Sequence, residues 1–503
     1  MAGTTGRKRP NIVLFNPDHY RGEAMGHAGN PCVHTPHVDS LVENGAMSFT
    51  RTFCQNPVCV PSRCSFMSGW YPHVAGHRTM AHLMRPGEPV LLKTLKDSGY
   101  HVWWGGKNDL VAGQFGTDAY CHVKFKPPPG TGGDAVHAEL PEGWRGDPGS
   151  EGYHSFFGGR LEIPPGKRLF PDHDLAMVEG AIEYLGNRPV DKPFCIFLPL
   201  LNPHPPIAVE EPFFSMIERD RVPPRIVPPP NYRGKSSMMG GIAERTGLGG
   251  WDEDRWRELR AVHYGMCSRV DHLFGMLLEE LEQQGLLEET LVIFFSDHGM
   301  YAGDYGLVDI NQNTFEDVLT RVPLVIKPPA DHALTGRFVP GTCDALVELL
   351  DLPATILEFA EISADWPHFS RSLVPLMDRT VNDHRDAVFC EGGRLHGEEQ
   401  AMEKHYPPGH QDPHDLYYPR LSLQAAEGPE HTKAVMCRTG QWKYVYRLYE
   451  QDELYDLQND PGEVDNLVDV PNHGETLNTL RERVLRFMVE TADVVPLELD
   501  RRW

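Results

Sequence analysis

The sequence contains no run of apolar residues that approaches the roughly 20 needed to span a bilayer, so we expect no transmembrane segment. Its basic N-terminus runs directly into a strand-like segment, with no apolar signal core and no cleavage site. We therefore expect a cytoplasmic protein. The 10 cysteines do not follow the spacing of a small disulfide-stapled domain, and we expect most of them to be reduced and buried.

Basic residues are scarce relative to acidic ones. The chain has 47 Lys and Arg against 71 Asp and Glu, a formal net charge of -24. An acidic chain repels nucleic acid and anionic lipid, so we expect neither as a partner. Internal repeats and low-complexity tracts are also lacking, which excludes a repeat architecture.

Short apolar runs predict buried parallel strands, which carry apolar side chains on both faces. Helical spacing of apolar residues fills the intervals, most clearly between residues 252 and 284. This alternation of strand and helix indicates a doubly wound α/β sheet, in which ligands bind outside the carboxyl ends of the strands. The predicted strands cover residues 11–15, 100–104, 193–200 and 291–296.

The pattern changes near residue 386, where short strands and a terminal helix predict a smaller antiparallel α+β subdomain. We expect a catalytic domain over 1–385 and the subdomain over 386–503. The predicted elements of the subdomain are strands over 432–437, 443–449 and 454–457 and a helix over 475–490.

Three long segments, 126–167, 221–250 and 395–420, are predicted to be loops. Loops of this length tend to be binding walls or lids. The third holds four histidines, but their spacing matches no standard metal-ligand set, so a solvated or subunit-contacting loop is the better interpretation. These histidines are His396, His405, His410 and His414.

The most specific motif is Cys-Val-Pro-Ser-Arg at residues 59–63, followed by Ser68 and Gly69. A phosphatase thiolate loop has more residues between cysteine and arginine and needs glycines that cradle a phosphate. A Cys–His protease has no local support here. A structural cysteine would leave the Pro-Ser-Arg that follows Cys59 unexplained.

This motif resembles the signature of the type I, formylglycine-dependent sulfatases of the alkaline phosphatase superfamily. Further segments resemble that family in the same order along nearly the whole chain. The resemblance implies a large mixed sheet flanked by helices on both faces, with a smaller C-terminal α+β subdomain. The matching segments are the strand ending at Asp18, residues 35–41, 296–299 and 321–324, and residues 453–463.

The resemblance implies a metal site in which Asp18, Asp297 and His298 bind one divalent cation together with the modified residue 59. His19 lies where relatives have a second Asp or a Gln, and we include it as a candidate ligand. Oxygen ligands favour Ca²⁺, whereas the imidazoles leave Mn²⁺ or Zn²⁺ open.

The resemblance also implies that a formylglycine-generating enzyme converts Cys59 to an aldehyde. One hydroxyl of the hydrated aldehyde attacks sulfur, and loss of the proton from the other releases sulfate, so that covalent catalysis splits one difficult step into two. Arg63, four residues after Cys59, is expected to hold the diol and the metal ligands. Because the substrate is an anion, this acidic chain must supply positive charge at the site.

Lys107 follows a predicted strand and matches the family's sulfate-binding lysine, and His204 follows another and is expected to protonate the leaving oxygen or bind sulfate. Two usual cations are missing. Asp109 stands where many relatives have a histidine, and it is a candidate ligand for a cationic or hydroxyl-bearing part of the substrate. In place of a second lysine, Asn311 and Asn313 are candidate neutral donors to sulfate.

The sequence thus predicts hydrolysis of a small sulfate monoester, with an aryl, sugar or alkyl sulfate left open. A phosphodiesterase or phosphonate monoester hydrolase of the same superfamily is the alternative enzyme, although such relatives tend to have a longer spacing between cysteine and arginine. A non-catalytic protein that binds sulfated glycans is the alternative from another class. The sequence leaves the oligomeric state open.

Overall fold

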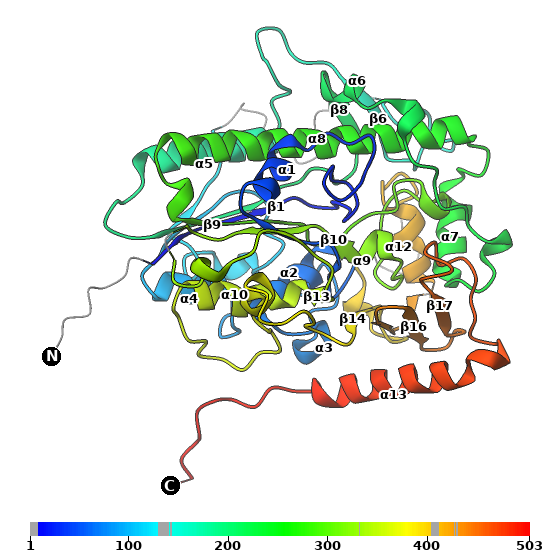
Figure 1. The fold of residues 1–503 in the computed structure, drawn as a ribbon. Helices are drawn as coiled ribbons and strands as arrows, with labels where there is room; N and C mark the ends of the chain where they lie inside the picture. Colours follow the sequence, from blue (N-terminus) through cyan, green and yellow to red (C-terminus); the bar gives the residue numbers. More distant parts are fainter. Residues whose placement is uncertain are drawn as a thin grey trace.

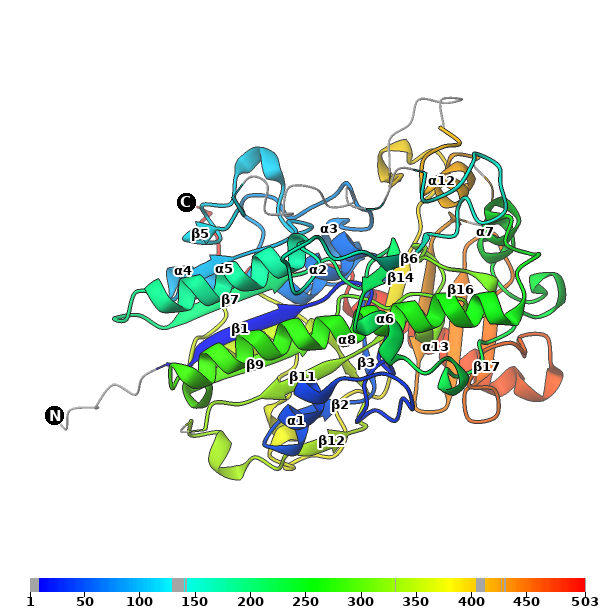
Figure 2. The same cartoon turned by 90° about the horizontal axis from the view of Figure 1, so that it is seen from above.

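The computed structural model describes residues 9–128, 140, 143–330, 332–403, 412–426, 428 and 431–502. Its main feature is an eight-stranded mixed sheet that lies between two layers of helices (Figures 1 and 2). The strand order is β12 (Gly341–Cys343), β2 (Met47–Phe49), β11 (Leu324–Lys327), β9 (Thr290–Phe295), β1 (Asn11–Asn16), β7 (Phe194–Pro199), β4 (His101–Trp104) and β5 (Val123–Lys124).

The centre of the sheet is parallel. Strands β9, β1, β7 and β4 run in one direction as direct neighbours, and β11 pairs antiparallel with β9. These four central strands are the four predicted from apolar runs, and each lies within one residue or so of its predicted bounds. The prediction of an α/β fold with a large mixed sheet is confirmed.

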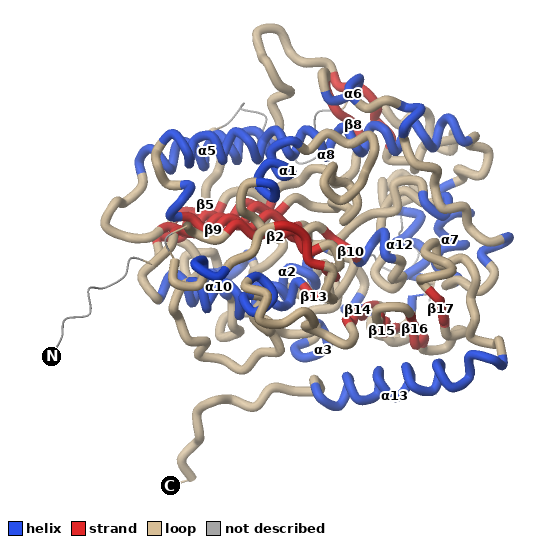
Figure 3. Tube along the Cα trace, viewed as in Figure 1, coloured by secondary structure: helices blue, strands red, loops and turns tan. Residues whose placement is uncertain are grey.

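Helices cover both faces of the sheet, as the tube drawing shows (Figure 3). Along β1, Ile12 and Leu14 belong to the core on one face, whereas Val13 and Phe15 belong to the core on the other. This alternation follows from the two-residue period of a strand, and it explains why the run is apolar throughout. One layer holds α1 (Pro36–Glu43), α5 (His173–Asn187) and α8 (Glu253–Gln283), and the other holds α2 (Cys59–Ser68), α4 (Leu91–Asp97) and α10 (Leu352–Phe359).

The C-terminal part forms a four-stranded antiparallel sheet with α13 (Gly474–Glu490) packed on it. The α+β subdomain is therefore confirmed, and its boundary at residue 386 stays a prediction. The sequence predicted three of its strands and missed β14, which begins just after that boundary. The strand order is β14 (Val388–Gly392), β15 (Ala434–Arg438), β16 (Trp442–Arg447) and β17 (Glu453–Asp456).

The segments predicted as loops contain regular elements. Segment 126–167 includes β6 (Phe157–Leu161), which pairs with β8 (Ile207–Glu210), and segment 221–250 includes α7 (Ser237–Thr246). Segment 395–420 enters α12 (Tyr418–Ala425), which packs against α7. Its residues His405 and His410 lie outside the described ranges. The remaining short elements are β3 (Thr52–Phe53), β10 (Arg321–Val322), β13 (Val347–Glu348), α3 (Pro72–Ala75), α6 (Phe213–Met216), α9 (Asp317–Thr320) and α11 (Val374–Met377).

All ten cysteines are buried and none forms a disulfide, as expected for reduced core residues. Among the described ranges, no helix combines the length and the apolar character that a membrane crossing requires. The cytoplasmic location stays a prediction.

The packing of α13 gives a stability prediction. Phe487 is 2% exposed and stacks on Phe389 of β14 with ring centroids 3.9 Å apart, whereas Leu485 on the same helix is 65% exposed. Phe487→Ala should destabilise the protein by about 3–5 kcal/mol because it leaves a cavity. Leu485→Ala should change stability by less than about 0.5 kcal/mol. Urea denaturation checks both variants, and equal shifts of their midpoints would contradict this packing.

Candidate active site

The predicted functional residues gather at one edge of the sheet. Asp18 follows β1, Asp297 follows β9, Lys107 follows β4 and His204 follows β7. Because these strands are parallel neighbours, their carboxyl ends open at the same edge, which is where ligands bind in such sheets.

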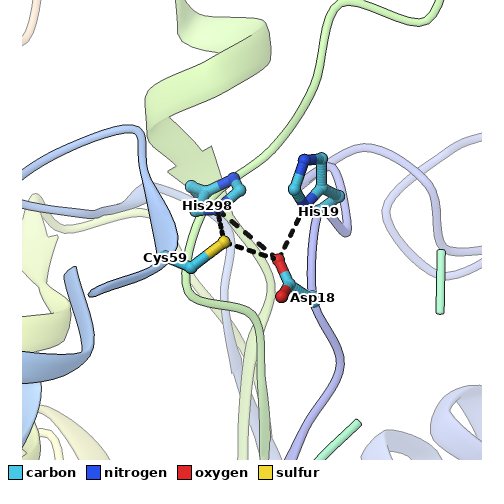
Figure 4. Close-up of side chains that lie close together, drawn as sticks. All are labelled: Asp18, His19, Cys59 and His298. Carbon is cyan, nitrogen blue, oxygen red and sulfur yellow. Dashed lines mark hydrogen bonds and ion pairs between the residues drawn. The ribbon is translucent and has the colours of Figure 1, made fainter. Parts of the chain in front are cut away.

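Helix α2 brings the cysteine to this edge. Cys59 is the first residue of α2, so its side chain lies at the positive end of the helix dipole, where negative charge is stabilised. The Cys59 Sγ lies 3.2 Å from Nε2 of His298 and 3.5 Å from Oδ1 of Asp18 (Figure 4). Sγ marks the place that the oxygen atoms of a modified side chain at this position would take.

Four side chains present possible metal-ligand atoms that all lie within 4.8 Å of one another: Asp18, His19, Cys59 and His298. The Nδ1 of His298 lies 2.9 Å from the carbonyl oxygen of Gly299. Since a carbonyl can only accept, Nδ1 donates, and Nε2 directs its lone pair at the other members of the cluster (Figure 4). Burial lowers the pKa of His298, which also favours the neutral ring that a metal requires.

His19 joins the cluster in a different way. Its backbone has φ +63°, in the left-handed region that is uncommon outside glycine, and its Nδ1 lies 2.6 Å from Oδ1 of Asp18. Its Nε2 lies 3.4 Å from Oδ1 of Asp309. Burial lowers the pKa of His19, but the two carboxylates outweigh this effect and raise the pKa above its usual value. His19 would have to give up one of these contacts to bind a metal.

Arg63 connects the two predicted metal-binding carboxylates. It lies one turn after Cys59, and its guanidinium is 2.9 Å from Oδ2 of Asp297 through Nε and 3.1 Å from Oδ2 of Asp18 through Nη2. Ser62 donates a hydrogen bond to the carbonyl oxygen of Asp297 at 2.7 Å. Asp297 is thus attached to α2 at two points, beside the four-residue cluster.

The charges explain the ionisation of the buried carboxylate. Burial alone raises the pKa of Asp18, but Lys107 and His19 outweigh it and hold the pKa well below its usual value. Asp18 is therefore an anion at neutral pH. In contrast, burial and then Asp18 raise the pKa of the Cys59 thiol well above its usual value, so the unmodified cysteine is a poor nucleophile.

This donor set fits a divalent cation. It combines the carboxylate of Asp18, which is ionised, with an imidazole nitrogen of His298 whose lone pair faces it. Asp18, His298 and residue 59 would hold the ion, with Asp297 beside them. The oxygen ligands favour Ca²⁺, and the imidazole is also compatible with Mn²⁺ or Zn²⁺.

Lys107 faces the same cluster. Its Nζ lies 2.5 Å from Oδ2 of Asp18, 2.8 Å from Oδ2 of Asp109 and 4.0 Å from Sγ of Cys59. The backbone before it is tightly fitted, because Gly106 has φ +87° and its missing Cβ would lie 2.1 Å from the carbonyl oxygen of Pro199. Glycine at 106 is therefore what allows Lys107 to reach the site.

His204 lines the cavity above the cluster, with its ring centroid 4.3 Å from that of His19. Its Nδ1 lies 2.5 Å from the carbonyl oxygen of Pro205. Burial, followed by the charges of His19 and Lys107, lowers the pKa of His204 well below its usual value. The ring is thus neutral in this state, and a bound anion would shift its pKa upward again.

Two predicted substrate-binding residues lie elsewhere. The described residues that line the cavity include Asp109 but not Asn311 or Asn313, both of which are fully buried. Asn313 donates from Nδ2 to the carbonyl oxygen of Thr432 at 3.1 Å, and Asn311 accepts from the backbone of Asn313 at 3.2 Å. Neither contact reaches the cavity, and a sulfate-binding role for the two asparagines stays a prediction.

The structure adds cavity residues that the sequence analysis missed. The cavity has a volume of about 270 Å³ and reaches from Cys59 to Asp309, Glu403, Tyr417 and Arg420. For segment 395–420 the sequence favoured a solvated or subunit-contacting loop, whereas Glu403, Tyr417 and Arg420 of this segment line the cavity. No local motif distinguishes these side chains. Only their assembly in the fold shows that they share one cavity.

Comparisons with known proteins identify the family of this chain. A family model described as sulfatase matches residues 10–362. An ulvan-active sulfatase of Formosa agariphila is 26% identical and covers 96% of this chain and 82% of its own length. A choline-sulfatase of Rhizobium meliloti is 25% identical and covers 99% of this chain and 91% of its own length.

Solved structures show the same fold. A phosphonate monoester hydrolase of Agrobacterium radiobacter superposes with a TM-score of 0.72 at 20% identity, covering 96% of each chain. A 2-O GAG sulfatase superposes with a TM-score of 0.67 at 19% identity, and the match covers 96% of this chain and 93% of the other. The chain belongs to the sulfatase family, and its fold is that of the alkaline phosphatase superfamily. It is a sulfuric ester hydrolase by this membership.

The backbone at Gly106 gives a testable prediction. Gly106→Ala should destabilise the protein by about 1–3 kcal/mol, because it adds left-handed strain and a clash with Pro199. Gly113→Ala is the matched control, since its Cβ would have no atom within 4 Å. Thermal unfolding measures both variants. An unchanged midpoint for Gly106→Ala would contradict the close approach of Gly106 to the end of β7.

Proposed function

We propose that this chain hydrolyses a small sulfate monoester to an alcohol and inorganic sulfate, with formylglycine made from Cys59 as the nucleophile. The observation that carries the proposal is the position of Cys59. It begins a buried helix within 3.5 Å of both Asp18 and His298, beside Arg63 and Lys107. When bound, the metal supplies Lewis-acid polarisation of the ester, and the hydrated aldehyde supplies the attacking hydroxyl.

The protein residues have distinct roles in this proposal. Arg63 holds Asp18 and Asp297 in fixed positions through charge-assisted contacts with both carboxylates in a buried site. Lys107 adds a positive charge on the open side of the cluster, where it can bind a sulfate oxygen. The site thus concentrates positive charge in a chain that is acidic as a whole.

His204 binds the sulfate group or protonates the leaving oxygen in this proposal. The low pKa of its ring counts against a proton donor in the free protein. A bound sulfate ester is an anion close to the ring and raises that pKa, so protonation and substrate binding are linked. A histidine in this state can deliver its proton to a leaving alkoxide.

The related proteins support the substrate class. Their names include an ulvan-active sulfatase and a choline-sulfatase, and one solved neighbour was determined with D-glucosamine-2-N,6-O-disulfate as its substrate. The cavity of about 270 Å³ favours a substrate of similar small size. Maturation requires a formylglycine-generating enzyme, and Ca²⁺ is the proposed ion.

The alternatives have less support. The phosphonate monoester hydrolases share the fold, but a likeness at 20% identity carries the fold alone. A protein that only binds sulfated glycans would not need the ionised cluster around a buried residue 59. The ester hydrolase therefore remains the proposed function.

Mass spectrometry can test the proposed conversion of Cys59 to formylglycine directly. In protein co-expressed with a formylglycine-generating enzyme, the peptide that contains Cys59 should lose about 18 Da, the difference between a thiol and an aldehyde side chain. Arg63 separates Cys59 from Cys64 on tryptic digestion, so the unmodified Cys64 peptide is an internal control. An unchanged mass at Cys59, with a control substrate converted, would remove the proposed nucleophile.

The metal site can be tested by stability as well as activity. Ca²⁺ should raise the thermal midpoint of the wild-type enzyme by mass action, and Asp297→Asn should abolish most of this shift. The same variant should lower kcat/KM for 4-nitrophenyl sulfate by at least ~10²-fold, because a hard cation loses a charged ligand. Asp254→Asn, an exposed position on α8, is the control. A full Ca²⁺ shift in Asp297→Asn would exclude this residue as a ligand.

A further inference from the structure

One wall of the cavity is built from the second half of the chain. Asp309 lies in the loop after β9, Glu403 precedes α12, and Arg420 lies in the first turn of α12. Cys59 and Lys107 line the same cavity. The sulfate group is bound at the metal cluster in the proposed function, so this wall faces the organic part of the substrate.

Arg420 holds the wall together. Its Nε donates to Oε2 of Glu403 at 2.8 Å, and its Nη1 contacts Asp309 and donates to the carbonyl oxygen of Ile310 at 3.0 Å. The guanidinium also lies 4.9 Å from the ring centroid of Tyr417. Contacts on several sides fix its orientation, as a specificity element requires.

The wall contains an acceptor that the described protein residues do not satisfy. Oε1 of Glu403 is buried and has no hydrogen-bond partner among them, and Glu403 is only 7% exposed. Leaving such an acceptor unpaired costs about 1–3 kcal/mol, and more when it is charged. Because Glu403 lines the cavity, a donor group on the ligand can recover this free energy.

The charges in the wall are already paired. Arg420 lies between Asp309 and Glu403, and Asp309 also lies 3.4 Å from Nε2 of His19. Elsewhere in the cavity, Lys107 pairs with Asp109 at 2.8 Å. This wall therefore has no spare cation for a second anionic group and no isolated carboxylate for an ammonium group. Paired carboxylates and guanidinium groups retain acceptor and donor capacity, which suits hydroxyl groups because these both donate and accept.

Apolar side chains complete the cavity. Met80, Leu201 and Leu421 line it together with the ring of Tyr417. They suit the C–H surface of a compact ring, and the volume of about 270 Å³ lies just below the range of drug-sized ligand pockets. The cavity thus combines a hydrogen-bonding side with an apolar side.

We propose that the Arg420–Glu403 ion pair, presented by α12, determines the specificity of this site by selecting an uncharged, polyhydroxylated ring as the leaving group. This inference rests on the proposed function, since it assigns the part of the substrate that carries the sulfate ester. Glu403 accepts from one hydroxyl, and the neighbouring guanidinium of Arg420 donates to the same or an adjacent hydroxyl. Both residues act on substrate choice and do not contact the reacting sulfur.

The test compares esters that differ in their hydroxyl groups. The matured full-length enzyme is assayed with glucose 2-, 3- and 6-sulfate, and with cyclohexyl and cyclohexylmethyl sulfate, which keep the ring and lack the hydroxyls. The best glucose ester should exceed both cyclohexyl esters in kcat/KM by at least ~10-fold, the value of one hydrogen bond to a charged group. Equal rates for the two kinds of ester overturn the proposal.

Glu403→Gln then assigns the preference to the wall. It should lower kcat/KM for the best glucose ester by about 10-fold or more and change that for the cyclohexyl esters by less than about 3-fold. Glu399→Gln, the same substitution at an exposed position four residues earlier, should change neither. Equal losses for both kinds of ester would show a merely structural role and overturn the proposal.

Two further outcomes separate this inference from the proposed function. If 4-nitrophenyl sulfate is hydrolysed and none of the glucose esters is, the specificity proposal fails and the sulfatase proposal stands. If no sulfate ester is hydrolysed although formylglycine is present at residue 59, the sulfatase proposal fails and this inference fails with it. Should Glu403→Gln not fold, the comparison of esters with the wild-type enzyme still decides the case.

Discussion

The site depends on one buried guanidinium that bridges two carboxylates from neighbouring strands. Asp18 and Asp297 would repel each other at the ends of β1 and β9, and Arg63 reaches both from the first turns of α2. Removing one partner of a buried ion pair typically costs 3–5 kcal/mol, because it leaves an uncompensated charge. Arg63 therefore stabilises the junction between α2 and the sheet. Its two contacts also fix the distance between the carboxylates of Asp18 and Asp297 and keep Cys59 beside them.

The remaining charges follow from this arrangement. Lys107 lies against the open side of Asp18, and the Cys59 position lies at the positive end of α2, so an anionic group meets favourable electrostatics from two directions. In the cavity wall, Arg420 lies between Asp309 and Glu403, so each of these carboxylates has a cationic neighbour. The acidic composition of the chain is compatible with the proposed binding of an anion because Arg63 and Lys107 both lie within a few ångströms of Asp18.

The central strands and most residues of the candidate site could be predicted from the sequence because the patterns that indicate them are local. Each central strand is a continuous apolar run, and each functional residue follows its strand within about ten positions, so the parallel topology alone brings Asp18, Asp297, Lys107 and His204 to one edge. Helix α7 was missed because two glycines lower its helix propensity by about 1 kcal/mol each. One of them, Gly241, is needed for packing, since a Cβ there would lie 2.9 Å from Leu423 of α12.

The cavity wall could not be predicted for a different reason. Asp309, Glu403 and Arg420 share no motif or period, and about 100 residues separate the first from the last, so only tertiary contacts reveal their relation. Asn311 and Asn313 are the opposite case, because the sequence predicted them as substrate-binding residues and they do not line the described cavity. Their position after the second metal motif suggested a role in the site, yet Asn313 contacts Thr432 in the C-terminal part.

The burial of Cys59 has a consequence for the order of events in the cell. Its side chain is 3% exposed, and all of α2 is buried around it. In the proposed maturation, the converting enzyme would have to reach a side chain that the folded protein encloses. Conversion would then compete in time with folding, and a chain that folded first would keep the unmodified cysteine until it unfolded again.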